Sequence, residues 1–106
     1  MELTIEKAVE EENENNETLL YLEGRLTTSS ADYLEKRLSE EFEDPDCKHI
    51  ILDLRAIDML SSMGIRVFLK TYKNAMINNK KFEIQNPSKP VRNVLGLANL
   101  EQLLAK

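Results

Sequence analysis

Apolar and polar residues alternate at the start of the chain, and this two-residue period predicts a pair of β-strands. Residues 2–9 (ELTIEKAV) form the first strand, with its apolar side chains on one face. The polar run over residues 10–17 (EEENENNE) is typical of a hairpin connection. Residues 18–23 (TLLYLE) form the returning strand, which Gly24 ends.

Three later segments repeat their apolar residues every three or four positions, which is the period of an α-helix. Helices are expected over residues 28–42, 62–77 and 88–97, and the chain ends in a further short helix. Ser29 with Asp32 three residues later resembles a capping pair at the first helix. The stripes expected to face the core comprise Ala31, Leu34, Leu38 and Phe42 in the first helix, with Glu41 at its edge, and Ile65, Phe68, Leu69, Tyr72 and Met76 in the second.

Two short apolar runs complete the expected sheet. Residues 49–54 (HIILDL) carry three adjacent apolar residues, as in a central strand buried on both faces, and residues 81–85 (KFEIQ) form the last strand. Helices between consecutive strands favour parallel neighbours. The sequence therefore predicts one α/β domain over residues 1–106, with a mixed four- or five-stranded sheet and helices mainly on one face.

The composition is that of a globular protein of the cytoplasm. Of the 106 residues, 42% are hydrophobic and 31% are charged, and the formal net charge is −5. This acidic balance argues against nucleic acid and anionic membranes, because both require clustered Lys and Arg. The single cysteine, Cys47, favours a reducing compartment. Neither a signal peptide nor a run of about 20 apolar residues is found, so no membrane insertion is expected.

Residue types that carry catalysis or bind metals are sparse. His49 is the only histidine and precedes the central strand, whereas Ser61 and Ser62 follow it, so a Ser–His–acid triad is not expected. Cys47 and His49 are a single close pair without a second cluster, which argues against a metal site. Three glycines leave no phosphate-binding loop. We therefore expect neither an enzyme nor a cofactor.

Asp53 and Asp58 flank the exit from the central strand. They would bind a cation or act as acid and base, or they would serve as turn and cap residues. The second interpretation is favoured.

The stretch DMLSSMGIRVF (58–68) places two serines between a buried strand and a helix. Serine is a preferred N-cap because its oxygen accepts a hydrogen bond from a free amide of the first turn, and this explains one of the pair. Gly64 in the first turn lowers helix stability, so another group is expected to approach it closely. A phosphate would add a charge of about −1.5 to −2 at a helix N-terminus, which tolerates anions. A cap and a phosphorylation switch are therefore both open at Ser61 and Ser62.

The segment ILDLRAIDMLSSMGIRVFLK (51–70) resembles the signature of STAS domains, the anti-sigma factor antagonist family. Members carry a buried strand ending in Asp, a short loop, and a Ser-Ser/Thr-x-Gly-Leu-like stretch that opens a helix. LEGRLTTSSADYLEKRL (22–38) is similar to the family's GRLD…A..L stretch, and IQNPSKPVRNVLGLANLEQLL (84–104) is similar to its closing segment. Together these stretches cover most of the chain in the correct order.

The resemblance implies partner switching. Such proteins bind an anti-sigma factor, often a serine kinase, and thereby release a sigma factor; phosphorylation breaks the complex and a phosphatase restores it. Ser62 falls where the family's phosphorylatable serine stands, with Ser61 as its neighbour or alternate. The partner is expected on the loop 57–64, the second helix's first turn and the loop 24–30. The residues of this expected partner surface are Gly24, Arg25, Thr27, Thr28, Asp58, Ser61, Ser62, Met63, Gly64 and Arg66.

Two positions depart from the family pattern. Thr27 stands where Asp usually follows GRL, and Ser61 stands where an acidic residue often precedes the phosphorylated serine. Loss of two carboxylates would make the local field less negative, which should ease phosphate addition or change the choice of kinase. Met63 would be a docking contact if exposed and a packing residue if buried.

Two other functions fit the same fold. The domain would be a non-catalytic scaffold subunit of a larger complex, such as a stress-sensing assembly or a lipid-transport ABC system, in which Ser62 need not be modified. Alternatively it would bind a small anion or nucleotide at a helix N-terminus. The sequence does not predict the oligomeric state.

Overall fold

The computed structural model describes residues 2–8 and 17–105 and confirms the predicted order of strands and helices. The elements are β1 (Leu3–Lys7), β2 (Glu17–Leu26), α1 (Thr28–Glu43), β3 (His49–Leu60), α2 (Ser62–Ile77), β4 (Lys81–Gln85) and α3 (Lys89–Leu97). Most of the predicted connection over 10–17 lies outside the described residues, and its last residue already belongs to β2. The predicted final helix is a 3₁₀ turn at Glu101–Leu103, after which Leu104 bridges to Ile84 of β4.

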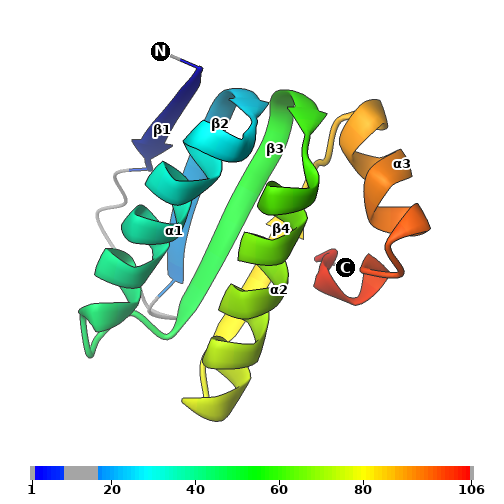
Figure 1. The fold of residues 1–106 in the computed structure, drawn as a ribbon. Helices are drawn as coiled ribbons and strands as arrows, with labels where there is room; N and C mark the ends of the chain where they lie inside the picture. The colour runs from blue at the N-terminus through cyan, green and yellow to red at the C-terminus, as the bar shows by residue number, and fades with distance from the viewer. Residues whose placement is uncertain (1, 9–16, 106) are drawn as a thin grey trace.

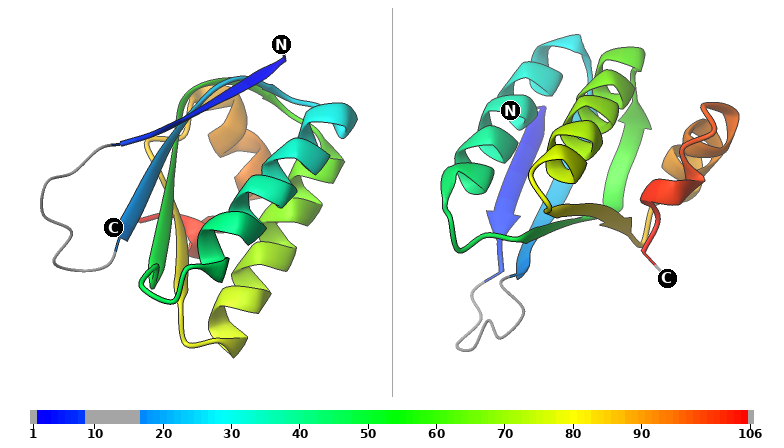
Figure 2. Two further views of the ribbon diagram at one scale, coloured as in Figure 1. Left: turned by 90° about the vertical axis from the view of Figure 1, so that its left-hand side faces the viewer. Right: turned by 90° about the horizontal axis from the view of Figure 1, so that it is seen from below.

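Within the described residues, four strands form one mixed sheet in the spatial order β1-β2-β3-β4. β1 and β2 are antiparallel, whereas β2, β3 and β4 are parallel. α1 connects β2 to β3 and α2 connects β3 to β4, as parallel neighbours require. The two long helices lie side by side across one face of the sheet, and α3 lies beyond α2 (Figure 1, Figure 2). The predicted architecture is therefore confirmed.

Apolar side chains fill the layer between the sheet and the helices. Within this layer, Phe68 of α2 packs on Phe82 of β4, with their ring centroids 6.2 Å apart. Burying one such side chain stabilises the fold by about 1.5–3 kcal/mol, so this layer rather than helix propensity holds α1 and α2 in place. The other fully buried side chains include Leu20, Leu22, Leu52, Leu54 and Ile84 of the sheet, Ala31 and Leu34 of α1, and Val91 and Leu95 of α3.

The buried face of α2 is rotated from the predicted stripe. Met76 was expected in the core but is 59% exposed, and its neighbour Ala75 is buried instead. The core face runs through Gly64, Val67, Phe68, Thr71 and Ala75. The prediction followed large apolar side chains and missed this face, because three of these five positions carry small or polar residues.

The start of α1 also differs from the prediction, because Ser29 and Asp32 do not form its cap. The N-cap is Thr27, whose backbone is extended (φ −94°, ψ −179°). Thr27 and Ser30 form a reciprocal pair: the Ser30 amide donates to Thr27 Oγ1 (3.4 Å), and the Thr27 amide donates to Ser30 Oγ (2.9 Å). An N-cap residue must lie outside the helix, and Ser29 already lies inside it.

β3 is longer than predicted. It runs to Leu60 rather than ending at Leu54, because its pairing with β2 resumes after the exposed residues that interrupt its apolar run. The expectation of a loop over residues 57–64 was therefore wrong, whereas partner binding by these residues stays a prediction. This stretch consists of the end of β3, the single residue Ser61, and the first turn of α2.

β2 likewise continues past Gly24, where it was predicted to end, and reaches Leu26. Gly24 has φ +121°, and a Cβ on it would lie 2.0 Å from the backbone oxygen of Glu2. A side chain is excluded there because the backbone of Glu2, the residue before β1, lies directly against Gly24. The pairing between β2 and β3 shifts register twice in the same stretch, which no hydrophobic pattern predicts.

Candidate functional site

Two helix N-termini lie next to each other at one edge of the sheet. β2 and β3 are parallel neighbours, so α1 and α2 begin at the same edge and run back along the same face (Figure 1). The ends of the two strands are joined directly, because the Ser61 amide donates to the Leu26 carbonyl at 2.8 Å. The residue after Leu26, Thr27, caps α1, while Ser61 caps α2. This edge is the candidate site.

Ser61 and Ser62 have different surroundings. Ser61 is the N-cap of α2, and its Oγ accepts a hydrogen bond from the Gly64 amide at 3.3 Å. Ser62 is the first helical residue and is exposed, and its hydroxyl makes no hydrogen bond within residues 2–8 and 17–105. Of the two roles that were open for the pair, the cap therefore belongs to Ser61.

Gly64 allows α2 to begin directly against the strand ends. A Cβ at this position would lie 2.6 Å from Leu60 Cδ1 and 3.3 Å from Leu26 Cβ. The close approach that the sequence predicted at this glycine is confirmed. Met63 beside it is partly buried and packs against the core, so much of its surface serves packing.

The structure brings the other predicted site residues to the same edge. Arg25 in β2 pairs with Met59 in β3. Arg66 lies one helical turn after Ser62, on the same side of α2. The predicted residues that are exposed here are Arg25, Thr28, Asp58, Ser62 and Arg66, whereas Gly24, Thr27, Ser61 and Met63 are partly covered and Gly64 is buried.

Sequence reasoning missed one acidic residue of the site. Thr27 Oγ1 donates a hydrogen bond of 2.6 Å to the Glu2 carboxylate, although the two residues are 25 positions apart. A carboxylate is therefore present beside Thr27, where the sequence alone indicated a loss of negative charge. Only the antiparallel pairing of β1 with β2, which places Leu3 opposite Gly24, brings Glu2 to this place, so no local motif could have identified it.

The favoured interpretation of Asp53 and Asp58 as turn and cap residues was wrong, because both lie within β3, where Asp53 is buried and Asp58 is exposed. The Asp53 side chain is 1% exposed and accepts hydrogen bonds from the backbone and guanidinium of Arg55, Gln85 Nε2 and Asn86 Nδ2. Burial raises the pKa of Asp53, but these hydrogen bonds outweigh it and hold the pKa below the usual value. Asp53 thus ties β3 to the end of β4. No cluster of three His, Cys, Asp or Glu side chains suited to a metal occurs among the described residues.

His49 begins β3, whereas the serine pair follows its last residue, as the sequence predicted. Its side chain is 13% exposed and lies between two carboxylates, with Nε2 2.6 Å from Glu83 and Nδ1 3.5 Å from Glu17. Cys47 is buried, and its sulfur lies 3.4 Å from Thr18 Oγ1. His49 is thus a strand residue whose neighbours are acidic, and it is not the base of a serine nucleophile.

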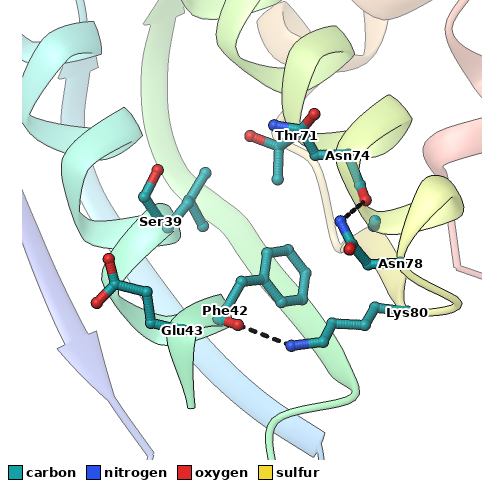
Figure 3. A pocket seen from close by; sticks show the side chains of 9 residues that line it. Ser39, Phe42, Glu43, Thr71, Asn74, Asn78 and Lys80 are labelled. Atoms are coloured by element: carbon teal, nitrogen blue, oxygen red, sulfur yellow. Dashed lines mark hydrogen bonds between the residues drawn. The ribbon is translucent and has the colours of Figure 1, made fainter. Parts of the chain in front are cut away.

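A cavity of about 310 Å³ lies between the C-terminal halves of α1 and α2 (Figure 3). Thr71 is 7% exposed, and its hydroxyl points toward α1 without a hydrogen-bond partner in the described part of the chain. Lys80 Nζ donates to the Phe42 carbonyl at 2.7 Å. Because α1 and α2 both begin at the opposite edge, this cavity is separate from the candidate site. The lining residues are Leu38, Ser39, Phe42, Glu43, Thr71, Asn74, Ala75, Asn78 and Lys80.

Comparison with known proteins agrees with this geometry. The family model of the STAS domain matches residues 7–105. The chain belongs to the STAS domain family. An anti-sigma F factor antagonist of Paenibacillus polymyxa is 28% identical to this STAS domain over 100 residues, which cover 91% of this chain and 82% of that protein.

Solved structures share the fold. The anti-sigma factor antagonist SpoIIAA in its unphosphorylated form superposes with a TM-score of 0.79 at 16% identity, covering 96% of this STAS domain and 86% of that chain. An anti-sigma factor antagonist from Mycobacterium paratuberculosis has a TM-score of 0.76 at 20% identity, covering 95% and 83%. SpoIIAA in its phosphorylated form has a TM-score of 0.73. The resemblance predicted from the sequence is therefore confirmed at the level of family and fold. Among the described residues, no helix combines the length and apolar character needed to cross a bilayer.

Proposed function

We propose that this STAS domain is an anti-sigma factor antagonist that acts by partner switching in the cytoplasm. Its unmodified form would bind an anti-sigma factor with serine kinase activity, and phosphorylation of Ser62 would end that binding. One observation carries the proposal: Ser62 presents an exposed hydroxyl at the N-terminus of α2, while its neighbour Ser61 performs the structural task of capping the helix. The relatives named above are antagonists of the same kind.

The chemical step belongs to the partner. The kinase would transfer the γ-phosphoryl group of a nucleoside triphosphate to Ser62 Oγ, forming one P–O bond, breaking the bridging P–O bond and releasing the diphosphate and the hydroxyl proton. A phosphatase would return the serine by hydrolysis. The antagonist supplies the acceptor and no catalytic group, since His49 lies at the far end of β3 from the serines.

Phosphate at this position would change binding without disrupting the fold. The N-terminus of α2 tolerates an anion because its free amides and the helix dipole favour negative charge. A partner that docks over Ser62 would instead have to bury an unpaired charge, which costs several kcal/mol in principle. The proposed contact surface is the exposed edge formed by Arg25, Thr28, Asp58, Ser62 and Arg66.

Phosphopeptide mass spectrometry on the protein isolated from its own host tests this proposal. Trypsin should release Ala56–Arg66 (AIDMLSSMGIR), whose only hydroxyls are those of Ser61 and Ser62. Phosphate on Ser62 is expected, and it should disappear in Ser62→Ala but persist in Ser61→Ala. An unmodified peptide throughout growth and stress, together with a stable co-purifying complex, would refute the switch and favour the scaffold function.

A further inference from the structure

Glu2 is fixed beside the candidate site by contacts of both its backbone and its side chain. Its carbonyl accepts a hydrogen bond from the Arg25 amide at 2.8 Å, and Gly24 leaves room for that approach. Its carboxylate accepts the hydroxyl proton of Thr27 at 2.6 Å. The carboxylate makes no ion pair within the described residues, so its negative charge is not neutralised by a neighbouring cation.

The Glu2 carboxylate is bound at the N-terminus of α1, and Ser62 lies at the adjacent N-terminus of α2. Thr27, which holds Glu2, follows Leu26, and the Leu26 carbonyl accepts the amide of Ser61 at 2.8 Å. Ser62 is the next residue. A phosphate on Ser62 would therefore enter a region that already contains a fixed negative charge.

We propose that the Glu2 carboxylate opposes phosphate on Ser62, and that phosphorylation releases Glu2 from Thr27. This inference rests on the proposed function, because it takes Ser62 as the phosphate acceptor. Like charges on neighbouring elements repel each other, and the Thr27 hydroxyl has only one proton to donate. Loss of the Thr27–Glu2 hydrogen bond would extend the structural change from α2 to the N-cap of α1 and to Glu2. Phosphorylation would then alter a larger part of the surface that a partner contacts.

The experiment uses the full chain with phosphoserine encoded genetically at position 62, so that no natural kinase is needed. Phosphorus NMR then follows the second ionisation of the phosphate as a function of pH. Glu2→Gln should lower the pKa of that ionisation by about half a unit, the size expected for one nearby carboxylate at a surface dielectric. The amide signals of Thr27 and Arg25 should also move on phosphorylation, and move less in Glu2→Gln.

Glu6→Gln is the matched control. Glu6 is an exposed carboxylate in β1, four residues after Glu2, and it lies about 13 Å farther from the starts of α1 and α2 because β1 runs antiparallel to β2. Its charge is also screened over a Debye length of about 8 Å at physiological salt. Its removal should leave the phosphate pKa unchanged. Equal phosphate pKa values in the unsubstituted chain and Glu2→Gln would overturn the inference, as would equal shifts in both variants. Absence of phosphate on Ser62 in the host would contradict the proposed function but would not alter this measurement.

Discussion

Ser61 and Ser62 are identical side chains in adjacent positions, and the backbone at the start of α2 gives them different tasks. Ser61 is extended (φ −84°, ψ 168°) and turns its oxygen toward the Gly64 amide. Ser62 already has a helical backbone, and the residue is exposed. The sequence predicted that one serine of the pair is a cap. Which serine it is could be decided only from the structure, in which β3 ends at Leu60 and Ser61 follows.

Replacing each serine by alanine should separate these tasks. Ser61→Ala is expected to lower the free energy of unfolding by about 1 kcal/mol, the usual effect of losing an N-cap. Ser62→Ala should change it by less than about 0.5 kcal/mol, because an exposed residue without a hydrogen bond is lost. Urea denaturation of both variants measures the difference, and equal effects would contradict the assignment of the cap.

The Asp53 carboxylate should make the free energy of unfolding decrease at low pH. The pKa of Asp53 in the folded protein lies below its usual value, so its contribution is fully present above the pKa of the unfolded chain and is lost as pH falls through the folded pKa. Asp53→Asn should therefore destabilise the protein by about 2–4 kcal/mol at pH 7, because buried donors lose a charged acceptor. The difference between the two proteins should shrink well below pH 4.

Denaturation of both proteins at neutral and acid pH checks this. The comparison between the two is needed because the pKa of Glu41 is also lowered: burial raises it, but Lys7 and Arg37 outweigh burial. The stability that the unsubstituted protein loses in acid therefore includes contributions from both Asp53 and Glu41. If the stability difference between the two proteins were the same at pH 7 and in acid, the ionised carboxylate of Asp53 would not be the cause of that difference.

At the scale of elements, the sequence predicted the bounds of α2 and β4 correctly and those of β3 poorly. α2 begins after a serine and ends before Asn78, and both signals are local. β3 continues to Leu60 through backbone pairing with β2, and that pairing depends on a neighbour that is distant in sequence. The same limit explains why Thr27 was missed as a cap and Glu2 as part of the site.

The packing of α2 against the strand ends can be tested at its glycine. Alanine normally favours a helix over glycine by about 1 kcal/mol. At Gly64 the added Cβ meets Leu60 Cδ1 at 2.6 Å, so Gly64→Ala should instead destabilise by about 1–3 kcal/mol through overpacking.

Gly96 of α3 is the control for this substitution. A Cβ there would come no closer than 3.6 Å to a side chain, so Gly96→Ala should be neutral or stabilising by up to about 1 kcal/mol. Thermal melts of both variants measure the contrast. A stabilised Gly64→Ala protein would mean that α2 does not rest on the strand ends as described.

At the scale of the whole molecule, the fold should survive a phosphate at Ser62. The helix dipole contributes about 0.3–1 kcal/mol in favour of an anion there, which offsets repulsion from nearby carboxylates. Protein with phosphoserine at position 62 should keep its circular dichroism spectrum and melt within a few degrees of the unmodified protein.

Phosphoserine at position 39 provides the contrast. Ser39 is exposed on α1, where Glu35 and Glu43 lie four residues before and after it. A phosphate between these like charges should lower the melting temperature more than one at Ser62. If both modifications lowered it equally, the N-terminus of α2 would have no special tolerance for the anion.

The common starting edge of α1 and α2 has a consequence for how such proteins diverge. The exposed residues of the edge contribute little to the core, whereas the buried layer lies behind them. After gene duplication, two copies could therefore change their edge residues and acquire separate partners while inheriting the same interior. A cell could hold several regulators of this kind in parallel, each insulated from the others by a few surface substitutions.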